Sequence, residues 1–194
     1  LEKPILSVEN TNRGKNAKAS ITLQNFGTDD INKLYATIDI LDLSGKKLSS
    51  TTTETIQLQS LISTVLSTDI NTASLNPGNY KAKATVFYEN KMEETNEVDF
   101  RVGDLIVNIN NFTKEVAANQ ISEFNIWVES GWNDKIKDVY AEVIVSKEEV
   151  ELKSFITLSI DLEPWATDNI IGYLDAFGMQ AGEYDIKINL NYEG

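Results

Sequence analysis

The sequence of 194 residues contains no cysteine and no histidine. Without cysteine the chain can form neither a disulfide framework nor a thiolate site, and cysteine usage gives no information about its redox compartment. Without histidine it lacks the commonest transition-metal ligand and the commonest general base. Only carboxylates, lysines, tyrosines and hydroxyls remain for chemistry. The composition therefore predicts a protein that is not an enzyme and that carries no cofactor and no metal site.

Positive charge and long apolar runs are also scarce. The chain has 17 Lys and Arg against 30 Asp and Glu, a formal net charge of −13. No basic stripe stands out against this balance, so we expect no nucleic-acid partner. The apolar runs are only a few residues long, against the roughly 20 residues that a membrane-spanning helix needs. We therefore expect no membrane span.

Acidic residues occur in pairs, such as Asp29–Asp30 and Glu148–Glu149. A calcium site needs about six to eight oxygens that converge on one point, and none of these pairs lies in a calcium-loop pattern. We interpret the pairs as solvated charge in turns. A loop calcium at a domain junction, through Asp104, is an alternative that the pattern leaves open.

Two stretches of the chain resemble each other: LNPGNYKAKATVFYEN at 75–90 and MQAGEYDIKINLNYEG at 179–194. In each, Gly-x-Tyr is followed by strict alternation of apolar and polar residues, which is typical of a half-buried strand. INKLYATIDI at 31–40 likewise matches IKDVYAEVIV at 136–145. Because the blocks recur in the same order at a shift of about 105 residues, the sequence predicts a duplicated domain.

The repeat places a domain boundary between Gly103 and Asp104, which gives domain 1 (1–103) and domain 2 (104–194). The alternation, the frequent turn signals and the scarcity of helical periodicity predict an all-β protein of two tandem immunoglobulin-like, two-sheet β-sandwiches, with all strands antiparallel. One helical turn before each Gly-x-Tyr is left open. In domain 1 we expect about seven strands, near residues 5–9, 18–25, 33–42, 46–58, 62–70, 79–89 and 96–102.

The Gly-x-Tyr units predict a structural device. In immunoglobulin-like sandwiches a tyrosine near the start of the penultimate strand sends its hydroxyl back to an upstream backbone group, the tyrosine corner. Tyr80 and Tyr184 stand at that position, and Gly78 and Gly182 can take the positive φ that the preceding turn requires. We interpret these four residues as structural.

The blocks SITLQNFGTDD, ATIDILDLSGKKL and LNPGNYKAKATVFYEN resemble the CARDB/APHP-like and S-layer-associated immunoglobulin-like repeats of prokaryotic cell-surface proteins. The resemblance covers essentially all of domain 1. In domain 2, VESGWND replaces the Asn-x-Gly pattern, so membership there rests on the internal repeat. The resemblance implies a non-catalytic extracellular structural or adhesion module, a spacer or assembly segment whose partners are other domains of the same or neighbouring surface proteins.

Two other functions are considered. The first is a carbohydrate-binding accessory domain, in which Trp132 and Trp165, expected in loops of domain 2, would contact glycans; the structural alternative is that these rings plug the ends of the core. Trp127 alternates out of phase with its neighbours and faces either the second sheet or solvent. The second is a two-domain periplasmic chaperone, a class that needs a basic cleft, which this sequence does not show.

Domain 2 is predicted to lack its final strand. After Tyr88 the first copy continues through a hairpin and a strand to Val102, whereas two residues follow Tyr192. The penultimate strand of domain 2 would then present unpaired backbone groups. One interpretation is that the natural protein continues beyond Gly194; the other is that a strand of a neighbouring molecule, or a segment from the residue-1 side of the chain, fills the open edge, as in strand exchange.

Overall fold

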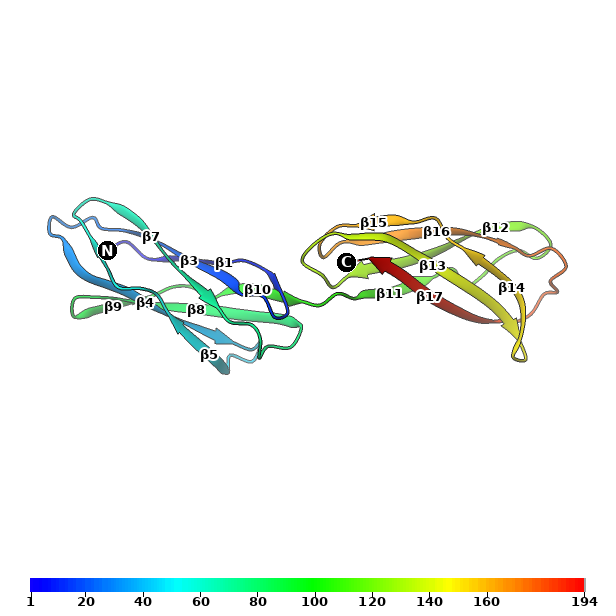
Figure 1. The fold of residues 1–194 in the computed structure, drawn as a ribbon, viewed down its shortest axis with the longest axis horizontal. Helices are drawn as coiled ribbons and strands as arrows, with labels where there is room; N and C mark the ends of the chain where they lie inside the picture. The colour runs from blue at the N-terminus through cyan, green and yellow to red at the C-terminus, as the bar shows by residue number, and fades with distance from the viewer. Residues whose placement is uncertain (194) are drawn as a thin grey trace. The chain divides into compact units, whose positions relative to one another are not determined.

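The computed structural model describes residues 1–193 (Figure 1). Regular structure among them consists of strands, and the loops before both Gly-x-Tyr units form turns rather than a helical turn. No helix of the described residues could therefore cross a membrane. The chain divides into two compact units, Leu1–Gly103 and Asp104–Gly194, at the boundary expected from the repeat. The all-β fold that the alternation predicted is confirmed.

Domain 1 is a sandwich of two sheets whose inward rows of apolar side chains form one core. The first sheet has the order β1-β3-β7, and the second has the order β2-β10-β8-β4-β5, with β6 paired to β4 and β9 to β8. Their bounds are β1 (Ile5–Val8), β2 (Thr11–Asn12), β3 (Ala17–Gln24), β4 (Ile31–Leu41), β5 (Lys47–Thr52), β6 (Ile56–Leu58), β7 (Ser63–Ile70), β8 (Gly78–Tyr88), β9 (Lys91–Glu94) and β10 (Val98–Gly103).

The strands of domain 1 differ from the predicted ones in three respects. The segment predicted as one strand over 46–58 is two strands, β5 and β6, and the short strands β2 and β9 were not predicted. The prediction that all strands are antiparallel is wrong for β2, which pairs in parallel with β10. After β1 the chain crosses to the other sheet without reversing, so β2 runs in the same direction as β10.

Domain 2 repeats this plan with fewer strands. One sheet has the order β11-β12-β16, as β1-β3-β7 does; in the other, β13 pairs with β14, β15 and β17, as β4 pairs with β5, β6 and β8. Within residues 104–193 no strand corresponds to β2, β9 or β10. The bounds are β11 (Val107–Phe112), β12 (Ile121–Ser130), β13 (Ile136–Lys147), β14 (Val150–Ile156), β15 (Ile160–Leu162), β16 (Thr167–Asp175) and β17 (Asp185–Glu193).

In both domains a buried threonine forms two hydrogen bonds to the backbone of the same alanine, at equivalent positions. In domain 1 the Thr53 amide donates to the Ala36 carbonyl (2.9 Å), and the Thr53 hydroxyl accepts from the Ala36 amide (3.0 Å). In domain 2, Thr157 makes the same two bonds with Ala141 (2.9 and 2.8 Å). These bonds satisfy buried backbone groups where the main-chain ladder is interrupted. The two domains therefore share individual hydrogen bonds, which the alternation of apolar and polar residues in the sequence did not predict.

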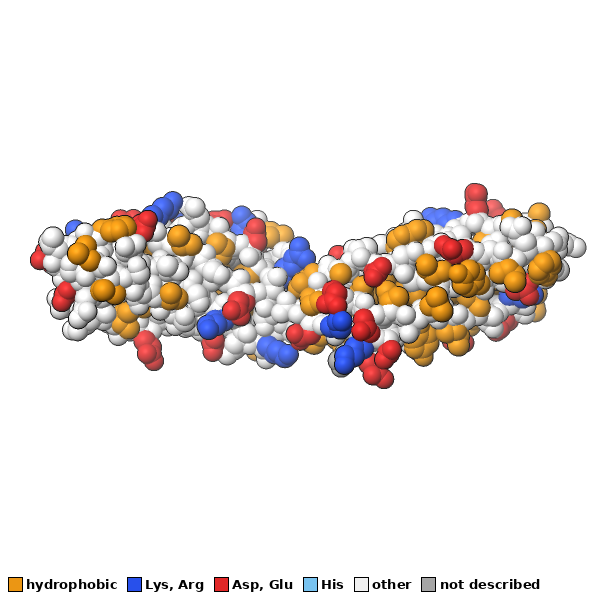
Figure 2. Space-filling model, turned by 90° about the horizontal axis from the view of Figure 1, so that it is seen from above, with side chains coloured by type: hydrophobic (Ala, Val, Ile, Leu, Met, Phe, Trp, Pro, Cys, Tyr) orange, Lys and Arg blue, Asp and Glu red, His pale blue; other side chains and the backbone are white. Residues whose placement is uncertain are grey.

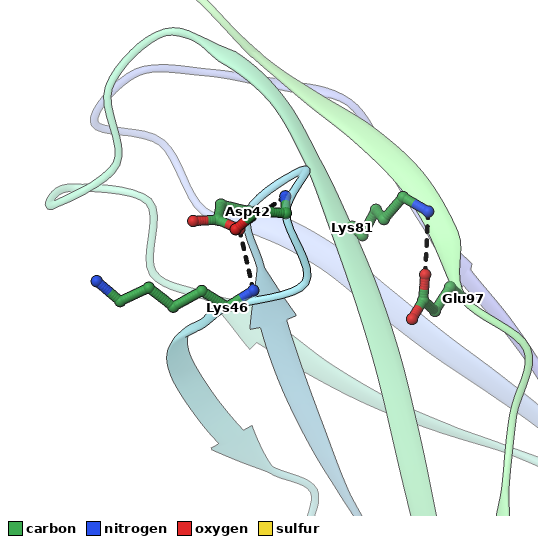
Figure 3. A network of polar contacts seen from close by, with 5 residues as sticks. Asp42, Lys46, Lys81 and Glu97 are labelled. Atoms are coloured by element: carbon green, nitrogen blue, oxygen red, sulfur yellow. Dashed lines mark hydrogen bonds and ion pairs between the residues drawn. The ribbon is translucent and has the colours of Figure 1, made fainter.

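The hairpin between β4 and β5 is closed by Asp42, shown in Figure 3. Its Oδ1 accepts from the Ser44 hydroxyl (2.5 Å) and from the amides of Ser44 (2.9 Å) and Lys46 (3.0 Å). The Ser44 hydroxyl bond, followed by the Lys46 amide bond, holds the pKa of Asp42 below its usual value, because both favour the ionised carboxylate. This acidic residue is thus a turn residue, as we interpreted the acidic pairs.

The matching hairpin of domain 2 carries backbone strain. Lys147 and Val150 are paired, and the two residues between them, Glu148 and Glu149, have φ of 52° and 65°. A two-residue turn with two positive φ values favours Asn-Gly, and a side chain at such a φ costs about 1–2 kcal/mol.

We expect Glu149→Gly to raise the free energy of unfolding of domain 2 by about 0.5–1 kcal/mol, because glycine relieves most of this strain. Urea unfolding followed by tryptophan fluorescence measures it, since all three tryptophans, Trp127, Trp132 and Trp165, lie in domain 2. Glu151→Gly, within β14, is the control and should lower stability. A loss of stability in Glu149→Gly would contradict the strain argument.

Candidate functional site

The Gly-x-Tyr units form the structural device that the sequence predicted. The Tyr80 hydroxyl donates to the Asn76 carbonyl (2.6 Å), and the Tyr184 hydroxyl donates to the Gln180 carbonyl (2.7 Å). Gly78 and Gly182 have φ of 156° and 158°, a region that side chains disfavour. The turn that precedes β8 in domain 1 and the turn that precedes β17 in domain 2 therefore have the same geometry.

The surroundings of the two tyrosines differ. In domain 1 the Tyr80 ring packs on Phe100 of β10, with 5.8 Å between ring centroids. In domain 2 the Tyr184 ring is approached instead by the Lys147 Nζ, 5.6 Å from its centroid. Among residues 104–193, no strand occupies the corresponding space beside Tyr184.

This space is a groove of ≈ 1080 Å³, which we call the domain 2 groove. One wall is the loop segment 113–116 with Ala118, after β11; the other wall is 182–186, at the start of β17. Large core side chains contribute to its lining, and Lys147 and Glu148 of the strained hairpin border it. The core side chains are Phe112, Phe124, Val145, Leu174 and Met179.

The groove lies at the position of β10. In domain 1, β10 sits between β2, which is parallel to it, and β8, which is antiparallel to it. Its inward residues pair with Gly78, Tyr80 and Ala82. The residues that stand about 104 positions later are Gly182, Tyr184 and Ile186, and these form one wall of the groove. The opposite wall is formed by the segment that comes after β11 in the chain, and the corresponding segment of domain 1, which comes after β1, contains β2.

The edge of β17 is unpaired among the described residues, since β17 pairs only with β13. In domain 1 the amide and carbonyl of Ala84 bond to Thr95, on the side of β9 and β10. Ile188 occupies the register position of Ala84, so its backbone groups point to the open edge. Ile186, Ile188 and Leu190 of β17 are only half-buried, whereas their counterparts Ala82, Ala84 and Val86 in β8 are fully buried.

The structure brings Trp132 and Trp165 together at one end of domain 2. The Trp165 amide donates to the Trp132 carbonyl (3.2 Å), and the Trp165 Nε1 donates to the Asn133 Oδ1 (2.9 Å). Both tryptophans are half-buried, and Trp132 packs against the core of domain 2. Trp132 thus packs on the core, and the Trp165 indole is held by the side chain of Asn133.

A different pair of aromatic residues faces solvent. Trp127 on β12 is 38% exposed and Tyr173 on β16 is 55% exposed. The two strands are neighbours, and their register places both rings on the outer face of the β11-β12-β16 sheet. Figure 2 shows hydrophobic side chains gathered on one face of domain 2. Of the two orientations considered for Trp127, the structure shows the one toward solvent.

The Asn-x-Gly motif of domain 1 and its replacement in domain 2 have the same role. The Asn25 Oδ1 accepts from the Gly27 amide (3.0 Å), and the Ser130 hydroxyl accepts from the Trp132 amide (3.1 Å). Both polar residues are buried at the end of the corresponding strands, β3 and β12. From the sequence, VESGWND was interpreted as a departure from the Asn-x-Gly pattern. The two segments nevertheless share one feature, a polar residue whose side chain accepts a hydrogen bond from the amide two positions later.

The acidic residues do not converge. In the part of the chain that the structure describes, no group of three or more potential acidic ligands could hold a metal ion. The Asp104 carboxylate accepts a hydrogen bond from the adjacent Leu105 amide (3.0 Å).

No protein-family model and no curated protein sequence matches this chain. Among solved structures, red sea bream transglutaminase aligns over 99% of this chain and 29% of its own, with 9% identity and a TM-score of 0.45. Alpha-2-macroglobulin from Escherichia coli aligns over 98% and 20%, with 10% identity and a TM-score of 0.41. The secreted serine protease VesC from Vibrio cholerae aligns over 97% and 50%, with 13% identity and a TM-score of 0.32. The chain thus spans half or less of these structures.

Proposed function

We propose that this protein is a non-catalytic extracellular structural or adhesion module, a spacer or assembly segment of a larger prokaryotic cell-surface protein. The observation that carries the proposal is that one sandwich is built twice in tandem with the same internal hydrogen bonds. Thr53 and Thr157, Tyr80 and Tyr184 all bond to backbone groups. Polar side chains used in this way stabilise the scaffold. A repeated scaffold suits a protein that transmits load or sets spacing.

Domain 1 has a strand arrangement that would resist extension. Its second strand, β2, and its last strand, β10, are parallel, so a force that pulls the chain ends apart shears this pair and loads its hydrogen bonds together. Two further bonds lie beside the pair. The Arg13 amide donates to the Gly103 carbonyl (2.8 Å), and the Arg101 amide donates to the Asn10 Oδ1 (2.8 Å). Domain 2 has no such pair within residues 104–193.

Single-molecule pulling tests the load-bearing part of the proposal. We expect two separate unfolding events, one for each domain, with the event of domain 1 at the higher force. Asn10→Ala should lower the force of that event only, because it removes the bond to Arg101 beside the sheared pair. Extension without resolved events, or an unchanged force in Asn10→Ala, would contradict a load-bearing role.

Labelling of intact cells tests the extracellular location. In the source organism, an antibody raised against this chain is expected to label unpermeabilised cells. Labelling that appears only after lysis would refute the location and with it the surface-module proposal.

The exposed aromatic face of domain 2 favours a second candidate, a carbohydrate-binding accessory domain. Trp127 and Tyr173 share this face, and flat aromatic rings with accessible faces can stack on sugar rings. A glycan array probed with the full chain tests this function. Binding that is lost in Trp127→Ala and kept in Trp165→Ala would support it; the absence of any bound glycan would dismiss it.

A further inference from the structure

We propose that the outer face of the β11-β12-β16 sheet binds an uncharged glycan chain of several sugars, which stacks on Trp127 and Tyr173. Both rings are exposed on this face. The inference rests on the second candidate function, carbohydrate binding, and adds the site and the class of ligand. Bound to a surface glycan, domain 2 would supply adhesion in a chain whose repeated scaffold supplies spacing.

Domain 1 shows that the fold does not require aromatic rings on this face. Its equivalent sheet, β1-β3-β7, has the same strand order, and the same alternate positions of β3 and β12 are buried. By register, Thr22 stands at the position of Trp127, and Asp69 stands at the position of Tyr173. The two rings are therefore additions to the outer face of domain 2 rather than parts of the common scaffold.

The residues next to the rings are polar. Asn111 of β11 and Asn169 of β16 lie directly opposite Trp127. Glu123 of β12 lies directly opposite Tyr173. A protein interface has an apolar centre from which charged residues are depleted. Single rings set among amides and a carboxylate instead favour a ligand with both apolar faces and many hydroxyls, which describes a sugar chain.

Hydrogen bonds between side chains hold the polar groups that lie between the rings. The Asn169 Nδ2 donates to the Asn125 Oδ1 (2.5 Å), and the Asn125 Nδ2 donates to the Glu123 Oε1 (2.8 Å). An amide nitrogen has two hydrogens, and a carboxylate accepts several bonds, so Asn125 keeps a donor and Glu123 keeps acceptors for a ligand. Groups fixed before binding lose less entropy when a ligand binds. This arrangement suits sugar hydroxyls, which both donate and accept.

The spacing of the rings defines the length of the ligand. Tyr173 pairs with Glu123, which lies four residues before Trp127 on β12, so the rings stand roughly 13 Å apart along the strand direction. A single sugar ring cannot reach both. The face therefore suits a chain of several sugars that crosses the amides between the two rings.

The charge of the face defines the charge of the ligand. None of the residues of β11, β12 and β16 is Lys or Arg. The outward positions of β12 include Glu123 and Glu129, and the whole chain carries a net charge of −13. An acidic glycan would be repelled and would find no cation on these strands. An uncharged glycan meets no such penalty.

A glycan array that includes uncharged, acidic and amino-sugar chains of different lengths tests the class of ligand with the full chain. We expect the bound glycans to be uncharged and longer than a disaccharide, and we expect binding to be insensitive to salt. Binding restricted to acidic glycans, or to single sugars and disaccharides, would overturn the inference. Binding restricted to amino-sugar chains and abolished by salt would also overturn it, because the carboxylates alone would then hold the ligand.

Titration calorimetry of variants with the best array glycan tests the site. Trp127→Thr installs the residue that domain 1 has at this position, and it should weaken binding about tenfold, as should Tyr173→Ala. Asn125→Ala should weaken binding about two- to tenfold. The control is Ile156→Thr, which also installs the domain 1 residue but at an exposed position of the other sheet, and it should bind like the wild type.

The outcomes distinguish this site from carbohydrate binding in general. Glycan binding that is unchanged in both Trp127→Thr and Tyr173→Ala would overturn the site and leave carbohydrate binding in place. The absence of any bound glycan would overturn the inference together with the second candidate function. Neither result changes the pulling and cell-labelling tests of the surface-module proposal.

Discussion

Phe100→Ala is expected to lower the free energy of unfolding of domain 1 by about 3–5 kcal/mol and to leave domain 2 unchanged. Phe100 is 1% exposed and packs on Tyr80. Its removal leaves a cavity between the sheets and weakens the attachment of β10. Because a domain of this size has a total stability of about 5–15 kcal/mol, such a loss would leave domain 1 marginal.

Urea unfolding separates the two domains without labels. Tryptophan fluorescence reports only domain 2, because domain 1 contains no tryptophan, while far-ultraviolet circular dichroism reports both. Leu43→Ala, at a side chain 63% exposed, is the control and should leave both transitions in place. If Phe100→Ala shifted the tryptophan transition as much as the dichroism transition, the two cores would be coupled and the argument from separate domains would fail.

The inward row of β17 differs from that of β8 in the size and burial of its side chains. The row Ala82, Ala84 and Val86 of β8 is replaced in β17 by larger residues, and these are half-buried. The larger side chains cover part of the core that β10 covers in domain 1. The domain 2 groove lies beside Tyr184, next to the N-terminal end of this row. The corresponding residues of β17 are Ile186, Ile188 and Leu190.

The alternation in the sequence predicted the long strands, the internal repeat predicted the boundary after Gly103, and the Gly-x-Tyr units predicted the tyrosine hydrogen bonds. The strands and the tyrosine bonds depend on local patterns, since a half-buried strand must alternate and the bond from Tyr80 reaches only four residues upstream. Alternation carries no such signal for β2, which has two residues, or for β9, whose residues are all exposed. The parallel pair of β2 and β10 also depends on a crossover between sheets, which no local pattern encodes.

The candidate site was predicted only in part. A count of residues after Tyr192 indicated an open edge, but the groove has a second wall after β11 that is brought near β17 only by the packing of the two sheets. The orientation of Trp127 could not be predicted, because alternation separates two faces without saying which one is inside. Trp132 and Trp165 were predicted in loops, and their mutual contacts depend on how those loops meet.

Asn25→Ala is expected to destabilise domain 1 by about 2–4 kcal/mol, the range for breaking a buried hydrogen-bond network. Asn25 is 2% exposed. Its Nδ2 donates to the carbonyls of Asp29 (2.9 Å) and Gln59 (3.2 Å), and its Oδ1 accepts from the Gly27 amide. Alanine would leave these groups without their partner. The same urea experiment measures the loss in the dichroism transition.

The repeat supplies the graded control for Asn25. Serine occupies the corresponding position in domain 2, where the Ser130 hydroxyl accepts from the Trp132 amide. Asn25→Ser should therefore lose less stability than Asn25→Ala. Asn25→Asp keeps an acceptor for Gly27 but turns a carboxylate toward the Asp29 and Gln59 carbonyls, so it should lose at least as much as alanine at neutral pH. An aspartate variant as stable as the wild type would show that the bonds donated by Nδ2 do not hold this turn.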